Sequence, residues 1–95
     1  MIIYYFVNFS YTVIKKRSVY TMTEFDKELG TILRKERESR RITQQQMADL
    51  LGCTKMAVSY WETGKRSMYA ETLKRYCAHL GITMQSVFDQ MGETK

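Results

Sequence analysis

From Thr23 onward, the apolar residues of this chain recur at the spacing of one face of an α-helix, and this pattern constrains the fold more than any other feature. Glycines interrupt the apolar stripes, and none of the 95 residues is a proline that could break a helix elsewhere. The pattern predicts five helices joined by short turns, over about residues 24–39, 44–51, 55–63, 70–80 and 84–91. We therefore expect an all-α bundle.

The residues at the predicted helix ends fit their positions. A threonine, whose hydroxyl can accept from a backbone N–H, precedes four of the helices: Thr23, Thr43, Thr54 and Thr83. A glycine, which tolerates the left-handed conformation, follows four of them: Gly52, Gly64, Gly81 and Gly92. The apolar stripes that the bundle should bury are Phe25, Leu29, Ile32, Leu33, Met47, Ala48, Leu50, Leu51, Leu73, Tyr76, Cys77, Leu80, Val87, Phe88 and Met91.

The amino-acid composition of the chain changes near residue 22. Residues 1–14, MIIYYFVNFSYTVI, are almost all β-branched or aromatic, which is typical of a strand, and they are too few to cross a membrane. Such an arm could dock on the bundle, pair with a second copy, stay disordered, or be an upstream extension of a chain that naturally starts at Met22. We divide the chain into an arm (1–22), a helical domain (23–92) and a tail (93–95).

The composition favours a polyanionic partner and excludes several other functions. Fifteen Lys and Arg against ten Asp and Glu give a net charge of +5 and a pI near 9.3. Cys53, Cys77 and His79 are too few for a disulfide scaffold or a zinc site, so we expect inert thiols in a reducing cytoplasm. No catalytic spacing or phosphate-binding loop stands out, and we therefore predict no enzymatic activity, no metal and no cofactor.

Residues 43–66, TQQQMADLLGCTKMAVSYWETGKR, carry the strongest functional signal, because two short helices flank a turn at Gly52. At about 100° per residue, an inner arc of the second of these helices gathers Ala57, Val58 and Trp61. The opposite arc gathers Lys55, Met56, Ser59, Tyr60 and Thr63. Such side chains can hydrogen-bond base edges or touch a thymine methyl, although a merely solvated polar face would also look like this.

This segment resembles the phage-repressor type of helix-turn-helix, the XRE family. The residues that carry the resemblance are Gln44, Ala48, Gly52, Val58, Glu62-Thr63-Gly64-Lys65-Arg66 and, downstream, Thr72-Leu73 with Leu80-Gly81-Ile82. It covers about residues 24–91. Met68 departs from the proline that the family often has, and Trp61 is bulkier than the usual aliphatic residue and is expected in the core.

The resemblance implies a five-helix, lambda-repressor-like DNA-binding bundle with specific roles for individual residues. The third helix (55–63) would enter the major groove, and the candidates for base contacts are Lys55, Met56, Ser59 and Tyr60. The second helix (44–51) would lie across the DNA backbone, and the candidates for phosphate contacts are Gln44, Thr54, Lys65 and Arg66. Arg37 and Glu62 would form a structural ion pair. Arg40 and Arg41, before the second helix, look more like part of the general positive field than like specific DNA contacts.

The predicted function is that of a sequence-specific, double-stranded-DNA-binding transcriptional regulator in the cytoplasm, associated with the nucleoid when bound. It would act as a homodimer through the fifth helix (Val87, Phe88 and Met91), through the arm, or through both, with no role at a membrane. The alternative is an antitoxin-like or anti-repressor-like module whose main partner is another protein, and the apolar arm is the feature that favours it.

Overall fold

The computed structural model describes residues 22–93, which form five helices and no strand. The helices are α1 (Met22–Ser39), α2 (Gln44–Leu51), α3 (Lys55–Thr63), α4 (Ala70–Leu80) and α5 (Met84–Glu93). All five predicted helices are therefore confirmed, and the fold is all-α. The predicted arm lies outside the described residues, apart from Met22 at its end.

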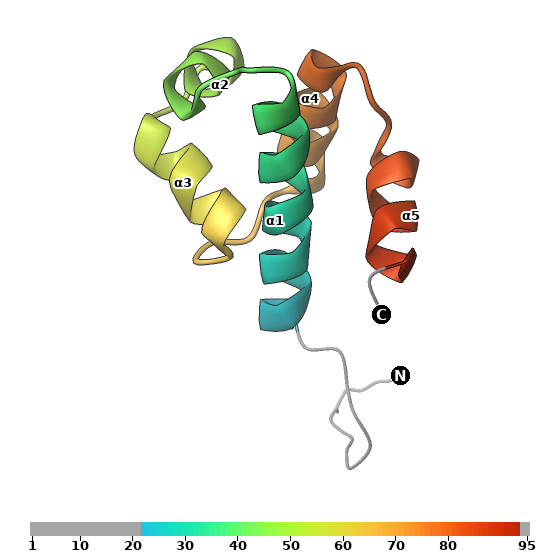
Figure 1. The fold of residues 1–95 in the computed structure, drawn as a ribbon. Coiled ribbons are helices and arrows are strands. Elements are labelled where there is room, and N and C mark those ends of the chain that lie inside the picture. Colours follow the sequence, from blue (N-terminus) through green and yellow to red (C-terminus); the bar gives the residue numbers. More distant parts are fainter. Residues whose placement is uncertain (1–21, 94–95) are drawn as a thin grey trace.

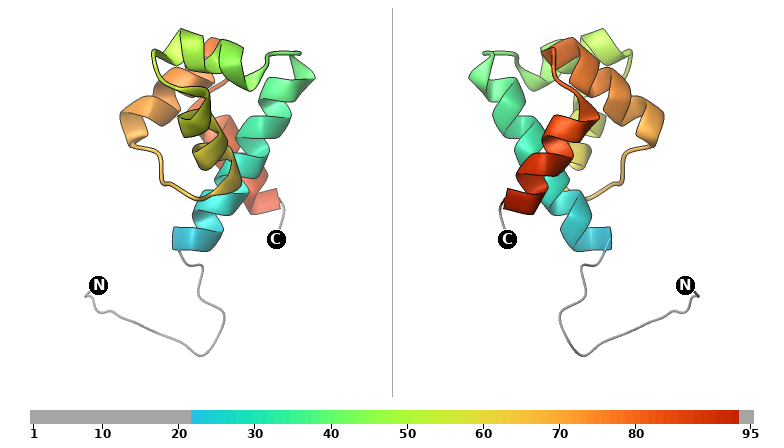
Figure 2. Two further views of the ribbon diagram at one scale, coloured as in Figure 1. Left: turned by 90° about the vertical axis from the view of Figure 1, so that its left-hand side faces the viewer. Right: turned by 90° about the vertical axis from the view of Figure 1, so that its right-hand side faces the viewer.

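The long helix α1 runs through the middle of the bundle (Figure 1). Helices α2 and α3 lie on one side of it, α5 lies on the other, and α4 completes the bundle behind α1 (Figures 1 and 2). Helix α1 contacts α3, α4 and α5, while α2 contacts α3 and α4. Among the described helices, α3 contacts only α1 and α2, so within residues 22–93 its outer face is open. None of the helices in this described part is both long and apolar enough to cross a membrane.

The helix ends follow most of the predicted caps. The Thr43 hydroxyl accepts from the backbone N–H of Gln46, whose side chain accepts from the backbone N–H of Thr43 in return. The glycines after α2, α3 and α4 are all left-handed, with φ between 71° and 77°. Two predictions are wrong: α1 already begins at Met22, so Thr23 is inside the helix, and α5 continues through Gly92 to Glu93.

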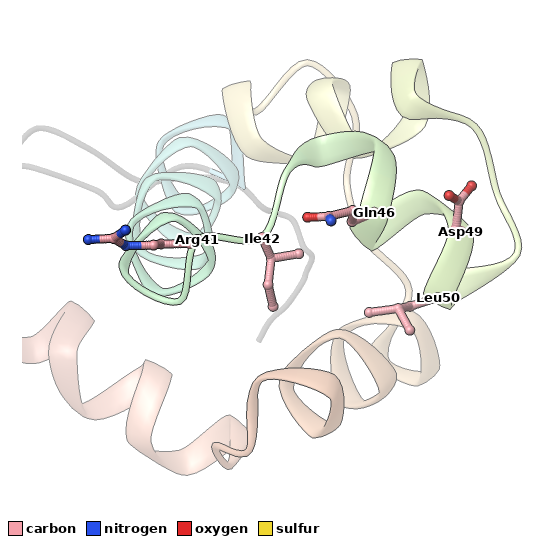
Figure 3. A pocket seen from close by; sticks show the side chains of 5 residues that line it. All are labelled: Arg41, Ile42, Gln46, Asp49 and Leu50. Atoms are coloured by element: carbon pink, nitrogen blue, oxygen red, sulfur yellow. The ribbon is translucent and has the colours of Figure 1, made fainter.

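The core matches the predicted apolar residues except at Leu50, Trp61 and Phe88. Leu50 is 47% exposed and, together with Arg41, Ile42, Gln46 and Asp49, lines an open pocket beside α2 (Figure 3). Trp61 is only half-buried, whereas the neighbouring Glu62 is buried. The inner face of α3 is thus centred on Val58 and Glu62, because an ion pair and not an indole fills the space next to α1.

A separate correction concerns the predicted dimer surface on α5. Val87 and Met91 are 0% and 5% exposed within a single chain, so they cannot form a contact with a second copy. They face the core because they lie on the side of α5 that covers α1. Phe88 remains partly exposed, at 37%, and its ring centroid lies 6.4 Å from that of Phe25.

Helices α1 and α3 approach each other closely at Gly30. A Cβ atom at this position would lie within 3.0 Å of the carbonyl oxygens of Trp61 and Glu62. Only glycine lets the backbones come this near, and the approach sets how far α3 stands from α1.

Candidate nucleic-acid interface

The turn between α2 and α3 is held by backbone and side-chain hydrogen bonds. Gly52 adopts φ 71°, and the Cys53 N–H donates to the carbonyl oxygen of Ala48 at 2.9 Å. The Arg75 guanidinium on α4 donates to the carbonyl oxygen of Leu51 at 3.0 Å, at the end of α2. These contacts fix the angle at which α3 leaves α2 and hence the direction of its outer face.

The outer face of α3 presents the predicted base-contact residues to solvent. Met56 is 62% exposed, Lys55 is exposed, and Ser59 and Tyr60 are half-buried. Lys55 forms no ion pair with any group between residues 22 and 93. The face therefore offers a cation, two hydroxyls and a thioether on two turns of helix.

The turn after α3 brings two cations next to this face. The backbone N–H groups of Lys65 and Arg66 both donate to the carbonyl oxygen of Tyr60, at 2.9 and 3.3 Å. The Arg66 guanidinium lies over the Tyr60 ring, with its carbon 5.1 Å from the ring centroid. Both side chains are exposed at the C-terminal end of α3, where a positive charge also interacts favourably with the helix dipole.

The other two predicted phosphate contacts already make hydrogen bonds within the chain. The Thr54 hydroxyl oxygen caps α3 by accepting from the Ala57 N–H at 3.1 Å, which leaves its O–H as a donor. The Gln44 side-chain amide donates to Glu62 Oε1 at 3.0 Å, and this side chain is half-buried. One N–H of that amide and the backbone N–H groups at the start of α2 stay available to an anion.

A buried carboxylate joins four helices behind the outer face. The Glu62 side chain on α3 is 0% exposed, and it pairs with the Arg37 side chain on α1, which is 5% exposed. Arg37 donates to Glu62 from Nε at 2.7 Å and from Nη2 at 2.9 Å. The Tyr76 hydroxyl on α4 donates to Oε2, and the amide of Gln44 on α2 donates to Oε1. We call these four side chains the Glu62 cluster.

The electrostatics of the cluster favour an ionised carboxylate. Burial raises the pKa of Glu62, but the donors Arg37, Tyr76 and Gln44 outweigh burial and hold the pKa below its ordinary value. Burial, followed by the hydrogen bond to Glu62, raises the pKa of the Tyr76 hydroxyl far above its ordinary range, so this group remains a donor. The hydrogen bonds of Arg37 to Glu62 are the main reason that the pKa of Arg37 is raised as well.

Several other cations stabilise the bundle and lie apart from the α3 face. Arg40 donates to the carbonyl oxygen of Leu80 at 2.8 Å and to Glu36 Oε1 at 2.7 Å, so its role is to link α1 with the end of α4. These contacts give Arg40 a structural role within the fold, and its part in the general positive field toward DNA stays a prediction. Arg34 forms an exposed pair with Glu38 at 3.0 Å.

The outcome for the predicted site residues is mixed. The structure gathers Lys55, Met56, Ser59 and Tyr60 on one exposed face and brings Lys65 and Arg66 to its end. It directs the side-chain amide of Gln44 inward instead. Sequence reasoning missed Tyr76 as a partner of Glu62 and Gly30 as the α1–α3 contact. The unexplained glycine inside a predicted helix was the one available signal for Gly30.

Comparison with known proteins identifies the type of domain. The sequence model described as "Helix-turn-helix" matches residues 33–87, which is more than half of the chain. The chain belongs to the helix-turn-helix family. Its α2–turn–α3 unit lies inside the matched range, and membership supports a DNA-binding transcriptional regulator over an enzyme. The search of the curated proteins found no match to this helix-turn-helix chain.

Solved structures share the helix-turn-helix fold. ClgR, the clp gene regulator of Corynebacterium glutamicum, is 22% identical with a TM-score of 0.70, covering 78% of this chain and 76% of that one. A second ClgR structure is 24% identical with a TM-score of 0.64, covering 76% and 88%. Hydroxypropylphosphonic acid epoxidase from S. wedmorenis is 25% identical with a TM-score of 0.61. That match covers 65% of this chain but only 33% of the epoxidase, so it reflects the helical fold.

Proposed function

We propose that this helix-turn-helix protein is a sequence-specific regulator that reads double-stranded DNA by inserting α3 into the major groove. The observation that carries the proposal is the contrast between the two sides of α3. The inner side is fixed by the buried Glu62 cluster, whereas the outer side exposes Lys55, Met56, Ser59 and Tyr60. A rigid helix with an exposed face of donors, acceptors and one apolar group is what base reading in the major groove requires.

The surrounding groups support contacts to the DNA backbone on both sides of α3. Lys65 and Arg66 lie at the C-terminal end, where they would neutralise phosphates of one strand. Thr54 and the start of α2 would meet phosphates of the other strand through an O–H and backbone N–H groups. For Gln44 we now assign one amide N–H to Glu62, and only its remaining N–H groups would contact a phosphate.

We further propose that the active form is a dimer on a near-palindromic site. One helix reads only a few base pairs, and a second copy about one helical turn away would supply the missing specificity. Since Val87 and Met91 are buried in the single chain, the contact would involve Phe88 or the N-terminal arm. Such a regulator would work in the cytoplasm, where the DNA is.

Selection of bound duplexes from random DNA, followed by gel shifts at moderate salt, tests this function. We expect a discrete site with two related halves. Enrichment of no sequence, combined with capture of a stable protein partner, would favour the antitoxin-like or anti-repressor-like alternative instead.

Two lysine variants then separate base reading from phosphate binding. Lys55→Ala should lose about 1–3 kcal/mol only on duplexes with the preferred base at one position of each half-site. Lys65→Ala, the matched control, should weaken binding to all duplexes alike and lower the salt slope by about one unit per subunit. Equal weakening of every duplex by Lys55→Ala would show that Lys55 reads no base.

A further inference from the structure

Arg66 is joined to Tyr60 in two independent ways. Its guanidinium carbon lies 5.1 Å from the centroid of the Tyr60 ring, and its backbone N–H donates to the Tyr60 carbonyl oxygen at 3.3 Å. A guanidinium over an aromatic face is attracted by the ring quadrupole. The neighbouring Lys65 shares only the backbone contact: its N–H donates to the same Tyr60 carbonyl oxygen at 2.9 Å.

The cation over the ring favours one orientation of the Tyr60 side chain. Tyr60 is half-buried on the outer face of α3, so packing fixes its side chain less tightly than that of the fully buried Val58. Within residues 22–93, no other aromatic or cationic side chain on this face contacts the Tyr60 ring. The position of the Tyr60 hydroxyl, which would donate to or accept from a base edge, therefore depends on Arg66.

We propose that Arg66 is a specificity-determining residue that acts by positioning Tyr60. It touches no base itself. While it neutralises a phosphate, its planar guanidinium holds the ring in the orientation that selects the base pair opposite Tyr60. This inference rests on the proposed function, because it names the residue that sets the selectivity of the same α3 face.

The test compares base preferences by sequencing duplexes bound by the full-length chain and its variants. Arg66→Gln should lower the preference at one position per half-site by about two- to fivefold, as expected for an exposed cation–π contact. Tyr60→Ala should lose preference at that same position. Lys65→Gln, which removes an equal charge one residue away, should weaken all duplexes without changing any preference. In a Tyr60→Ala background, Arg66→Gln should likewise act uniformly.

Two further measurements make the outcome decisive. Arg66→Lys keeps the charge but loses the planar group, and it should restore overall affinity more fully than base preference. In the free protein, NMR should show the Arg66 side-chain protons shifted upfield by the Tyr60 ring, and Tyr60→Ala should abolish this shift. If Arg66→Gln weakens every duplex alike while the wild type remains selective, the positioning role is overturned and the proposed function stands. A wild type that binds all duplexes equally would overturn both.

Discussion

Removal of the Glu62 carboxylate should destabilise the fold more than any loss of a surface charge. Glu62 is buried and accepts hydrogen bonds from Arg37, Gln44 and Tyr76. In Glu62→Ala, the buried Arg37 guanidinium would lose its close counter-ion and keep only the exposed Glu38 carboxylate, 3.9 Å from Nη2. Breaking a buried pair in this way typically costs about 3–5 kcal/mol. The two neutral donors would each lose about 1 kcal/mol more.

Relaxation around the cavity limits the total. Arg37 Nη1 keeps its hydrogen bond to the carbonyl oxygen of Ile42 at 2.6 Å, and water can enter beside the half-buried Gln44. We therefore expect a loss of about 4 kcal/mol, a large part of the roughly 5–15 kcal/mol that holds a small domain folded.

Urea unfolding of Glu62→Ala, Arg37→Ala and the double variant measures this. The double variant should lose at least about 2 kcal/mol less than the sum of the single variants, because neither charge is then left unpaired. Arg34→Ala is the matched control: it breaks the exposed pair with Glu38 and should cost below about 1 kcal/mol. Two results together would refute the reasoning. Glu62→Ala would lose no more than about 1 kcal/mol beyond this control, as a surface pair does, and the losses would add up in the double variant.

Three other predictions concern packing, pH and the arm. Gly30→Ala should destabilise the fold by about 1–3 kcal/mol in thermal melts, because its Cβ would press on the backbone of α3. This loss should outweigh the better helix propensity of alanine, and a rise in melting temperature would contradict the close approach. The pKa of Glu62 is lowered from 4.5 in the folded state, so the ionised carboxylate stabilises the fold above about that pH. This contribution is lost as the pH falls through the lowered pKa. In urea melts, Glu62→Gln should therefore lose less stability on acidification than the wild type does. A chain that starts at Met22 should fold, dimerise and bind its site as the full chain does. If sedimentation shows that it is monomeric and gel shifts show that it binds DNA at least about tenfold more weakly, the arm is part of the function.

The sequence by itself determined the helices and the family. Apolar periodicity, threonine caps and terminal glycines are local signals, so they predicted all five helices and most of their ends. The outer arc of α3 also followed from spacing, because residues three and four apart share a helix face. The inner arc followed only in part, since Glu62 is buried there and Trp61 is half-buried. The exposed positions of Lys55 and Met56 needed no knowledge of the other helices.

Only the tertiary structure decided which residues on those helices meet. The Glu62 cluster draws its side chains from four helices, and no local pattern specifies that Tyr76 and Gln44 converge on the same carboxylate. The same holds for α5: Val87, Phe88 and Met91 look alike in sequence, but the packing of α5 on α1 buries two of them and leaves Phe88 partly exposed. Burial depends on the partner helix and its crossing geometry, and these are properties of the assembled bundle.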